Sequence, residues 1–251
     1  MEKYVIIDSR DRIDKYNPSC DSTFELKYGG FYNVKSIELI SFSLPLTMYN
    51  INSSNNMIYY HVQGQPYDEI IAIQSQVAFI REGNYNAQQL ADALNETMNR
   101  SGQPEITVVY DEIRMKYVFS CSTPFSFRFG TNTISSAASI LGLENVDTDY
   151  ETNNEAENVA DLSYPSYIII SIIGLSTKIK STNCHDYGTF FCTNNGNGSD
   201  VFTWTTNSFY HQETECTSDN IKDLRIQIKT HNNQLLDLNG ADWSMFIKIN
   251  Y

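Results

Sequence analysis

The sequence predicts an all-β fold, either a sandwich or a barrel. Most of the chain consists of short runs rich in β-branched and aromatic residues, in which apolar and polar residues tend to alternate. These runs recur about every ten residues and are separated by turn-forming stretches rich in Gly, Asn and Pro. One segment alone has the periodicity of a long helix, so the alternating strand–helix units of a parallel sheet are not expected.

The predicted strands run along the whole chain. They are VKSIELISFSLP (34–45), MIYYHV (57–62), DEIIAIQSQVAFI (68–80), EITVVY (105–110), RMKYVFS (114–120), FSFRF (125–129), SYIIISIIG (166–174), IKDLRIQIKT (221–230) and WSMFIKINY (243–251). The turns between them are predicted at Tyr28–Gly30, Asn50–Asn56, Gln63–Pro66, Asn194–Gly198 and Leu238–Gly240. With 251 residues and 41% hydrophobic residues, the chain is long enough to bury a substantial core.

The C-terminal run predicts a central strand of the sheet. Its alternate side chains share one face, which we expect to be buried: Trp243, Met245, Ile247 and Ile249. Asn239-Gly240 before it is typical of a turn.

One amphipathic helix is predicted over about residues 86–100. Asn86 is a suitable N-cap, and Gln89 three residues later completes a capping-box pair. The apolar stripe that should pack on the sheet consists of Leu90, Leu94 and Met98. A second short helical piece, or a buried turn, is expected at Ser135–Leu141.

Charge and cysteine content exclude several classes of protein. The net charge is −13, with 17 Lys and Arg against 30 Asp and Glu, which disfavours binding to nucleic acid or to anionic membranes. No signal peptide is recognisable, and no apolar run is long enough for membrane insertion.

The five cysteines have no C-x-x-C spacing and suggest reduced thiols. A zinc site from Cys184, His185, Cys192, His211 and Cys216 is the alternative, although its spacing fits no structural zinc pattern.

Two segments are expected to be loops. Residues 144–161 hold seven acids and no base, which predicts a solvated acidic loop; Ca²⁺ binding by Asp147, Asp149 and Glu151 is the alternative. Residues 176–220 are rich in Thr, Asn, Gly and aromatics and predict long loops around one or two strands. Such loops suit contact with a partner or a glycan, and aromatics that cover a core edge are the competing interpretation.

No pattern of residues indicates an enzyme. The chain lacks G-x-S-x-G, H-E-x-x-H, a P-loop and G-x-G-x-x-G, and its four histidines form no recognisable triad or metal spacing. We therefore expect no catalytic residues, no cofactor and no metal.

A cluster of alternating charge follows the first apolar run. Tyr4–Ile7 leads directly into DSRDR, which places Asp8, Arg10, Asp11 and Arg12 together. The cluster is charge-neutral, so it does not attract phosphate, and it has no histidine or nucleophile beside it. The guanidinium fork of arginine pairs well with carboxylate. We expect either an assembly lock between subunits or a brace within one subunit.

The order of these motifs resembles a family of viral proteins. The series is DSRDR, then STFELKYGG after Pro18, then NVKSIELISFSLPLTMYNINSSNN, REGNYNAQQLADALNETMN, SAASILGL and LLDLNGADWSMFIKINY. It is similar to the penton and minor capsid proteins of virophages, Polinton-like viruses and related large DNA viruses of eukaryotes. The resemblance covers most of the chain and fades in 144–161 and 176–220.

The resemblance implies a fold and a role. It implies a single jelly-roll domain over residues 1–251, with the helix and long loops added, in the homopentamer that closes the fivefold vertices of an icosahedral capsid. The implied partners are other copies of this chain, the major capsid protein and other minor capsid proteins. The implied location is the virion capsid, assembled in the host cytoplasm or a virus factory. A minor capsid or cement protein, and a receptor- or glycan-binding β-sandwich, remain alternatives.

Overall fold

The chain forms two compact units. The computed structural model describes residues 1–26, 30–65, 76–99, 105–177, 179–180, 188–194, 200–207, 211–216, 220–230 and 233–251. Unit 1 comprises Met1–Met48 and Tyr164–Tyr251, and unit 2 comprises Tyr49–Ser163. The single jelly-roll domain expected over residues 1–251 stays a prediction beside this division into two compact units. Alternation of apolar residues marks strands but not their partners, so it does not distinguish one core from two.

Unit 1 is built from strands. They are β1 (Glu2–Asp8), β2 (Asp21–Glu25), β3 (Phe31–Tyr32), β4 (Ser36–Pro45), β10 (Tyr167–Ile173), β11 (Phe190–Thr193), β12 (Val201–Thr205), β13 (Gln212–Glu215), β14 (Asn220–Ile221), β15 (Asp223–Lys229) and β16 (Ser244–Asn250). A short 3₁₀ turn, Ser9–Asp11, follows β1.

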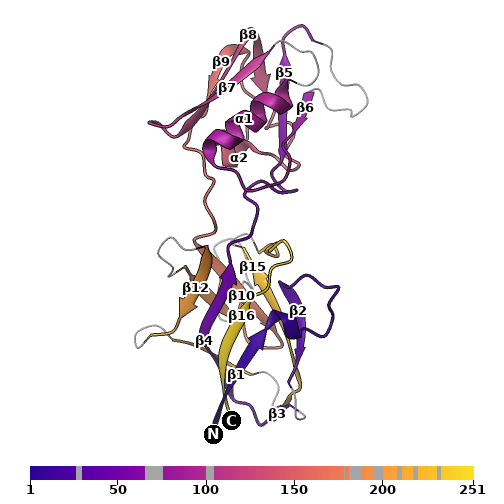
Figure 1. Ribbon diagram of the computed structural model, residues 1–251, viewed down its shortest axis with the longest axis vertical. Coiled ribbons are helices and arrows are strands. Elements are labelled where there is room, and N and C mark those ends of the chain that lie inside the picture. Colours follow the sequence, from indigo (N-terminus) through magenta and orange to yellow (C-terminus); the bar gives the residue numbers. More distant parts are fainter. Residues whose placement is uncertain are drawn as a thin grey trace. The chain divides into compact units, whose positions relative to one another are not determined.

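The strands of unit 1 form two principal antiparallel sheets (Figure 1). Their orders are β1-β16-β4-β12, with β13 also on β4, and β11-β10-β15-β2. Counted along the chain, the first of these eight main strands pairs with the eighth, the second with the seventh, the third with the sixth and the fourth with the fifth. A long hairpin wound into two sheets in this way is a jelly roll. The predicted all-β sandwich is confirmed, and its jelly roll is unit 1.

The core of unit 1 lies between its two sheets. β16 is a central strand between β1 and β4, and its inward side chains are buried: Met245, Ile247 and Ile249. Trp243, directly before β16, is buried as well, with its ring centroid 5.5 Å from that of Phe24 and 5.8 Å from that of Phe42. Its indole N–H donates to the Ser19 carbonyl at 2.7 Å, so the buried polar atom has a partner.

Unit 2 is inserted between β4 and β10 and has its own core. Its elements are β5 (Met57–Val62), β6 (Gln76–Phe79), α1 (Ala87–Met98), β7 (Ile106–Asp111), β8 (Lys116–Phe127), α2 (Ala138–Leu141) and β9 (Glu151–Glu155). The sheet order is β6-β5-β8-β7, and β9 also pairs with β8, at residues 118–120 and at Phe125. Part of the predicted strand 68–80, residues 68–75, lies outside the described residues, as do the predicted turn positions 28–29, 66 and 195–198.

Helix α1 agrees with its sequence signals. The Asn86 side chain accepts a hydrogen bond from the Gln89 backbone N–H at 2.8 Å, and the Gln89 side chain accepts one from the Asn86 N–H at 2.9 Å. This reciprocal pair is the predicted capping box. The apolar stripe is fully buried in the core of unit 2: Leu90, Leu94 and Met98.

Asn95 of α1 and Asn99, the C-cap of the helix, cover part of the free edge of β7. The Asn95 side-chain amide donates to the Val108 carbonyl at 2.8 Å and accepts from the Val108 N–H at 2.7 Å. Asn99, one turn later, makes the same two bonds with Ile106, both at 2.9 Å. Each amide imitates a neighbouring strand, so the outward backbone groups of Ile106 and Val108 are satisfied.

The acidic segment is not a loop throughout. β9 lies within residues 144–161 and pairs antiparallel with β8. Asp147 accepts hydrogen bonds from the Gly130 and Thr131 N–H groups, each at 2.9 Å, and its carboxylate therefore ties two backbone segments together. The proposed Ca²⁺ ligands do not gather: the described residues contain no group of three or more His, Cys, Asp or Glu placed to hold a metal ion.

Residues 176–220 contain more regular structure than predicted. They include strands β11, β12 and β13, two of which belong to the jelly roll itself. The aromatic side chains of these strands are largely core residues: Phe190, Phe202 and Trp204 are buried. Residues 178, 181–187, 195–199, 208–210 and 217–219 of this segment lie outside the described residues.

In the described part of the chain, no helix is long and apolar enough to cross a membrane.

Candidate assembly site

The charged cluster closes the end of β1. Asp8 caps the 3₁₀ turn by accepting a hydrogen bond from the Arg10 backbone N–H at 2.9 Å. The Arg10 guanidinium grips the same carboxylate with two donors, at 2.8 and 2.5 Å. The hydrogen bonds from Arg10 lower the pKa of Asp8 to about 2, so the carboxylate remains ionised far into the acid range.

Arg12 ties the two ends of the jelly-roll chain together. Its guanidinium donates to the Ser9 carbonyl at 2.7 Å and to the Asp242 carboxylate at 3.2 Å. The Ser9 hydroxyl donates to the same carboxylate at 2.6 Å and accepts from the Trp243 N–H at 3.0 Å. The end of β1 is therefore fixed to the segment that begins β16.

The two arginines differ in exposure. The side chain of Arg12 is 17% exposed, whereas that of Arg10 is 74% exposed. Asp11 is also exposed, and in the described residues its side chain makes no hydrogen bond or ion pair. The pairs Arg10–Asp8 and Arg12–Asp242 both lie within one chain, which is the arrangement expected of a brace within one subunit. The lock between subunits stays a prediction, for which Arg10 and Asp11 present the exposed groups.

Asp242 is the partner that sequence reasoning missed. It lies 230 positions from Arg12, and only the pairing of β1 with β16 brings it close. The available signal was an acid directly before the predicted C-terminal strand, at the end that an antiparallel partner would place beside DSRDR.

A surface hollow adjoins the cluster. Charged side chains and the small or apolar side chains of the neighbouring strands line it together: Asp8, Arg10, Ser43, Leu44, Pro45, Val201, Asp242, Trp243 and Ser244. The charged side chains in it are the ones already engaged with one another, so the hollow is a part of the bracing cluster.

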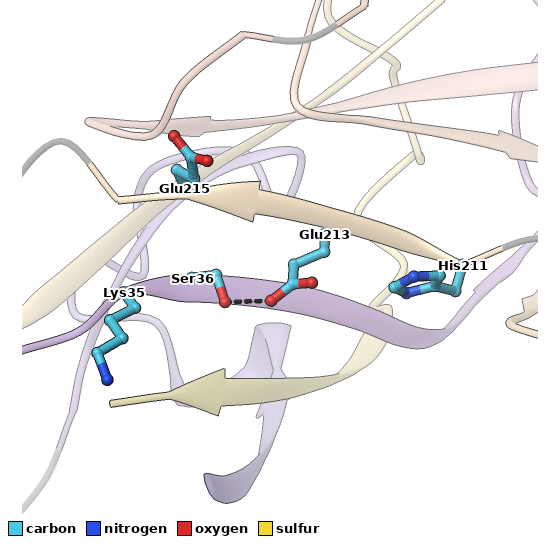
Figure 2. Close-up of a pocket in the computed structure, with 5 residues that line it drawn as sticks. All are labelled: Lys35, Ser36, His211, Glu213 and Glu215. Atoms are coloured by element: carbon cyan, nitrogen blue, oxygen red, sulfur yellow. Dashed lines mark hydrogen bonds between the residues drawn. The ribbon is translucent and has the colours of Figure 1, made fainter. Parts of the chain in front are cut away.

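A second hollow lies at the other end of the same sheet (Figure 2). It is lined by Lys35, Ser36, His211, Glu213 and Glu215. The Ser36 hydroxyl faces the Glu213 carboxylate and bonds to it, and the pKa of Glu213 is lowered chiefly by that bond. His211 is held instead by Glu38 through Nδ1 at 3.1 Å. The serine and the histidine thus have separate carboxylate partners, and neither is arranged to activate the other.

Glu38 anchors the polar network around this second hollow. Its side chain is almost buried on the outer face of β4, and besides His211 it forms an ion pair with Lys248 of β16. On the next row of the sheet, the Asn250 amide donates to Glu213 at 2.9 Å. The network ties β4, β13 and β16 together.

The cysteines do not assemble a zinc site within the described residues. Burial raises the pKa of the Cys192 thiol, and it raises the pKa of Cys20 and Cys216 to about 11 in each case. Thiols of this kind are protonated near neutral pH and react slowly. Cys184 and His185 of the proposed zinc set lie outside the described residues.

Fold and site together define an all-β protein whose jelly roll carries an inserted second unit and whose polar clusters connect strands. The chain belongs to the family described as "Family of unknown function (DUF5901)", whose model matches residues 3–251. No curated protein matches the chain. Among solved structures, it is similar to the crystal structure of the selenomethionine-labelled mavirus penton protein, with a TM-score of 0.49, 9% sequence identity, and coverage of 100% of this chain and 99% of that chain.

Proposed function

We propose that this protein is a structural component of a viral capsid, namely the penton protein that forms homopentamers at the fivefold vertices. The observation that carries the proposal is the topology of unit 1, an eight-strand jelly roll of the kind that recurs in viral capsids. The ordered motifs that resemble penton and minor capsid proteins support the same role.

The proposed ring sets requirements on the surface of unit 1. A closed ring of identical subunits uses heterologous contacts, in which one flank of each copy meets the opposite flank of the next. The charged cluster at the end of β1 could supply groups for such a contact, because Arg10 and Asp11 are exposed and carry charges of opposite sign. The major capsid protein would surround the ring, and the protein would act in the virion.

The glycan-binding alternative was based on the aromatic residues of 176–220. In the strands of this segment, three of these aromatics are core residues, because Phe190, Phe202 and Trp204 are buried. A minor capsid or cement protein remains the second candidate, because it needs the same fold but a different oligomeric state.

Native mass spectrometry of the purified full chain tests the proposal. A penton protein should appear at five times the chain mass of 28.7 kDa, and the pentamer should persist on dilution through the micromolar range. A monomer or a trimer at all concentrations would overturn the penton assignment and leave the minor capsid protein as the better interpretation.

A further inference from the structure

Side chains or neighbouring segments cover parts of most outer strand edges in the two principal sheets of unit 1. On β11, the Gln212 amide accepts from the Phe191 N–H at 2.7 Å and donates to the Phe191 carbonyl at 2.6 Å. On β2, the Ile13 N–H donates to the Thr23 carbonyl at 2.9 Å. These contacts occupy backbone groups that another strand would otherwise pair with.

The edge formed by β12 and β13 is covered as well. The Asn194 side chain accepts from the Thr203 N–H of β12 at 3.4 Å. Leu175 forms an antiparallel bridge with Cys216, directly after β13, and the Ser176 N–H contacts the Glu215 carbonyl at 3.5 Å.

β1 is the exception among these edges. Its ladder to β16 includes bonds at both ends, between Met1 and Tyr251 and between Ser9 and Trp243. Because hydrogen-bonding direction alternates along an antiparallel strand, the even-numbered residues of β1 direct their N–H and C=O groups away from β16. Within the described residues, no strand or side chain pairs with the outward backbone groups of Glu2, Tyr4 and Ile6.

The open edge also displays apolar side chains. Ile6 is 74% exposed and Tyr4 is 54% exposed, and the Tyr4 ring stacks on Phe246 of β16 at 5.6 Å between centroids. Seven residues of β1 pair with β16 in continuous register, without a bulge and without proline. Natural sheets normally protect such an edge against pairing, so an unprotected one indicates a strand-pairing surface.

We propose that the β1 edge binds an extended, basic segment of a partner protein as an added strand. Main-chain hydrogen bonds would supply affinity, and alternate apolar side chains of the segment would lie beside Tyr4 and Ile6. Charge favours a basic partner: this chain carries a net charge of −13, and the exposed Glu2 lies on the outward row of β1, where the carboxylate of Asp8 is already paired with Arg10. The inference deepens the proposed function, on which it rests only for the source of the segment, a neighbouring capsid protein.

A second copy of the chain fits this edge less well. Antiparallel pairing of two β1 strands about Val5 would place Glu2 of each copy opposite Asp8 of the other; like charges directly opposite each other destabilise a strand pair, and Arg10 offsets a part of this repulsion. A segment with basic residues at both ends and apolar residues between them meets the exposed carboxylate of Glu2 at one end and the Arg10-paired carboxylate of Asp8 at the other.

A synthetic peptide, acetyl-Lys-Thr-Ile-Thr-Val-Thr-Lys-amide, tests the proposal with the full-length protein. Fluorescence anisotropy of the labelled peptide should show saturable binding. The Tyr4→Pro variant removes one outward N–H, at a position where an edge strand tolerates proline, and Ile6→Lys places a repelling charge on the edge. Each change should weaken binding about tenfold or more, from the loss of main-chain bonds or from charge repulsion.

Ile113→Lys is the matched control, because it makes the same change at a 94% exposed isoleucine of unit 2 and should leave binding unchanged. Circular dichroism establishes whether each variant is folded. If Tyr4→Pro is not folded, the test depends on Ile6→Lys.

Absence of peptide binding, or equal binding to Ile6→Lys, would overturn the proposal. Loss of oligomers in Ile6→Lys would overturn it in favour of a second copy at the edge. A pentamer without peptide binding would refute this inference alone, and a monomer that binds the peptide would refute the pentamer alone.

Discussion

β7 in unit 2 and β1 in unit 1 are both outer strands, and they differ in whether their outward backbone N–H and C=O groups have hydrogen-bond partners. On β7, Asn95 of α1 and the C-cap Asn99 satisfy the outward backbone groups of Val108 and Ile106, whereas the outward groups of β1 are unpaired in the described structure. Side-chain amides thus cover a strand edge at β7, and in the described residues no side chain does so at β1. The contrast is between a strand edge of unit 2 that its own side chains cover and a strand edge of unit 1 that stays available for the pairing proposed above.

The two units also differ in how the chain builds them. Unit 1 joins residues from the two ends of the chain, and Met1 and Tyr251 exchange backbone hydrogen bonds. Unit 2 is one continuous segment whose beginning and end meet where the Asn50 side chain contacts the Leu162 carbonyl at 3.4 Å. Unit 2 can therefore be removed in thought without separating paired strands of the jelly roll.

The largest effect should come from truncating one core at a time. Trp243→Ala should lower the stability of unit 1 by about 3–5 kcal/mol, and Phe127→Ala should do the same for unit 2, since both side chains are buried among aromatic rings. Hydrogen exchange read for each unit is the measurement. Each variant should lose protection in its own unit, and equal loss in both units from either change would mean a single cooperative core.

The next effect sharpens the comparison of edges. Asn95→Ala and Asn99→Ala should each cost about 1–3 kcal/mol, because each leaves one N–H and one C=O of β7 without a partner. Denaturant unfolding measures the loss. Gln88→Ala, on the exposed side of the same helix, is the control and should have little effect. A neutral Asn95→Ala would show that water replaces the amide and that β7 is not a closed edge.

A smaller effect is expected at the end of β1. Arg12→Ala should cost about 1.5 kcal/mol, because it removes half-buried bonds to Ser9 and Asp242, and Arg10→Ala should cost less because its pair with Asp8 faces solvent. Thermal unfolding ranks the two. If the cluster spans subunits, the double variant should dissociate into folded monomers. An intact pentamer with only a lower melting temperature would leave the brace within one subunit as the whole role.

The smallest effect is a pH dependence. The pKa of Asp8, lowered to about 2 by Arg10, means that its pairing stabilises the folded state above the ordinary pKa of the carboxyl and is lost as pH falls through about 2. In Arg10→Ala the pKa should rise toward its usual value of 3.8. Carboxyl chemical shifts followed by NMR measure both values, and an unchanged Asp8 pKa would show that Arg10 does not hold it.

Sequence pattern was sufficient where one contiguous segment determines the structure. The alternation in residues 243–249 and the four-residue repeat of Leu90, Leu94 and Met98 each follow from a single element facing one core. β9 was missed because ETNNE has little strand propensity and forms a strand only through its pairing with β8. One or two strands were predicted in residues 176–220, where the structure has β11, β12 and β13, because these strands are short and lie among turn-forming residues.

The sequence alone did not predict which segments far apart in the chain become neighbours. The division into two units, the pairing of Arg12 with Asp242 and the coverage of β7 by two asparagines all depend on which segments become neighbours. Asn95 and Asn99 did carry a signal, two amides one helical turn apart and shortly before a strand, but that signal has a meaning only once the helix is known to lie along the strand.

One measurement tests most directly the claim that assembly belongs to the jelly roll and that unit 2 is a separate insertion. The measurement is the native mass of a variant in which a short Gly-Ser linker replaces residues 49–163, compared with the native mass of the full chain. We expect a folded protein with the same number of subunits as the full-length protein. An unfolded chain, or a folded monomer where the full chain is a pentamer, would contradict it.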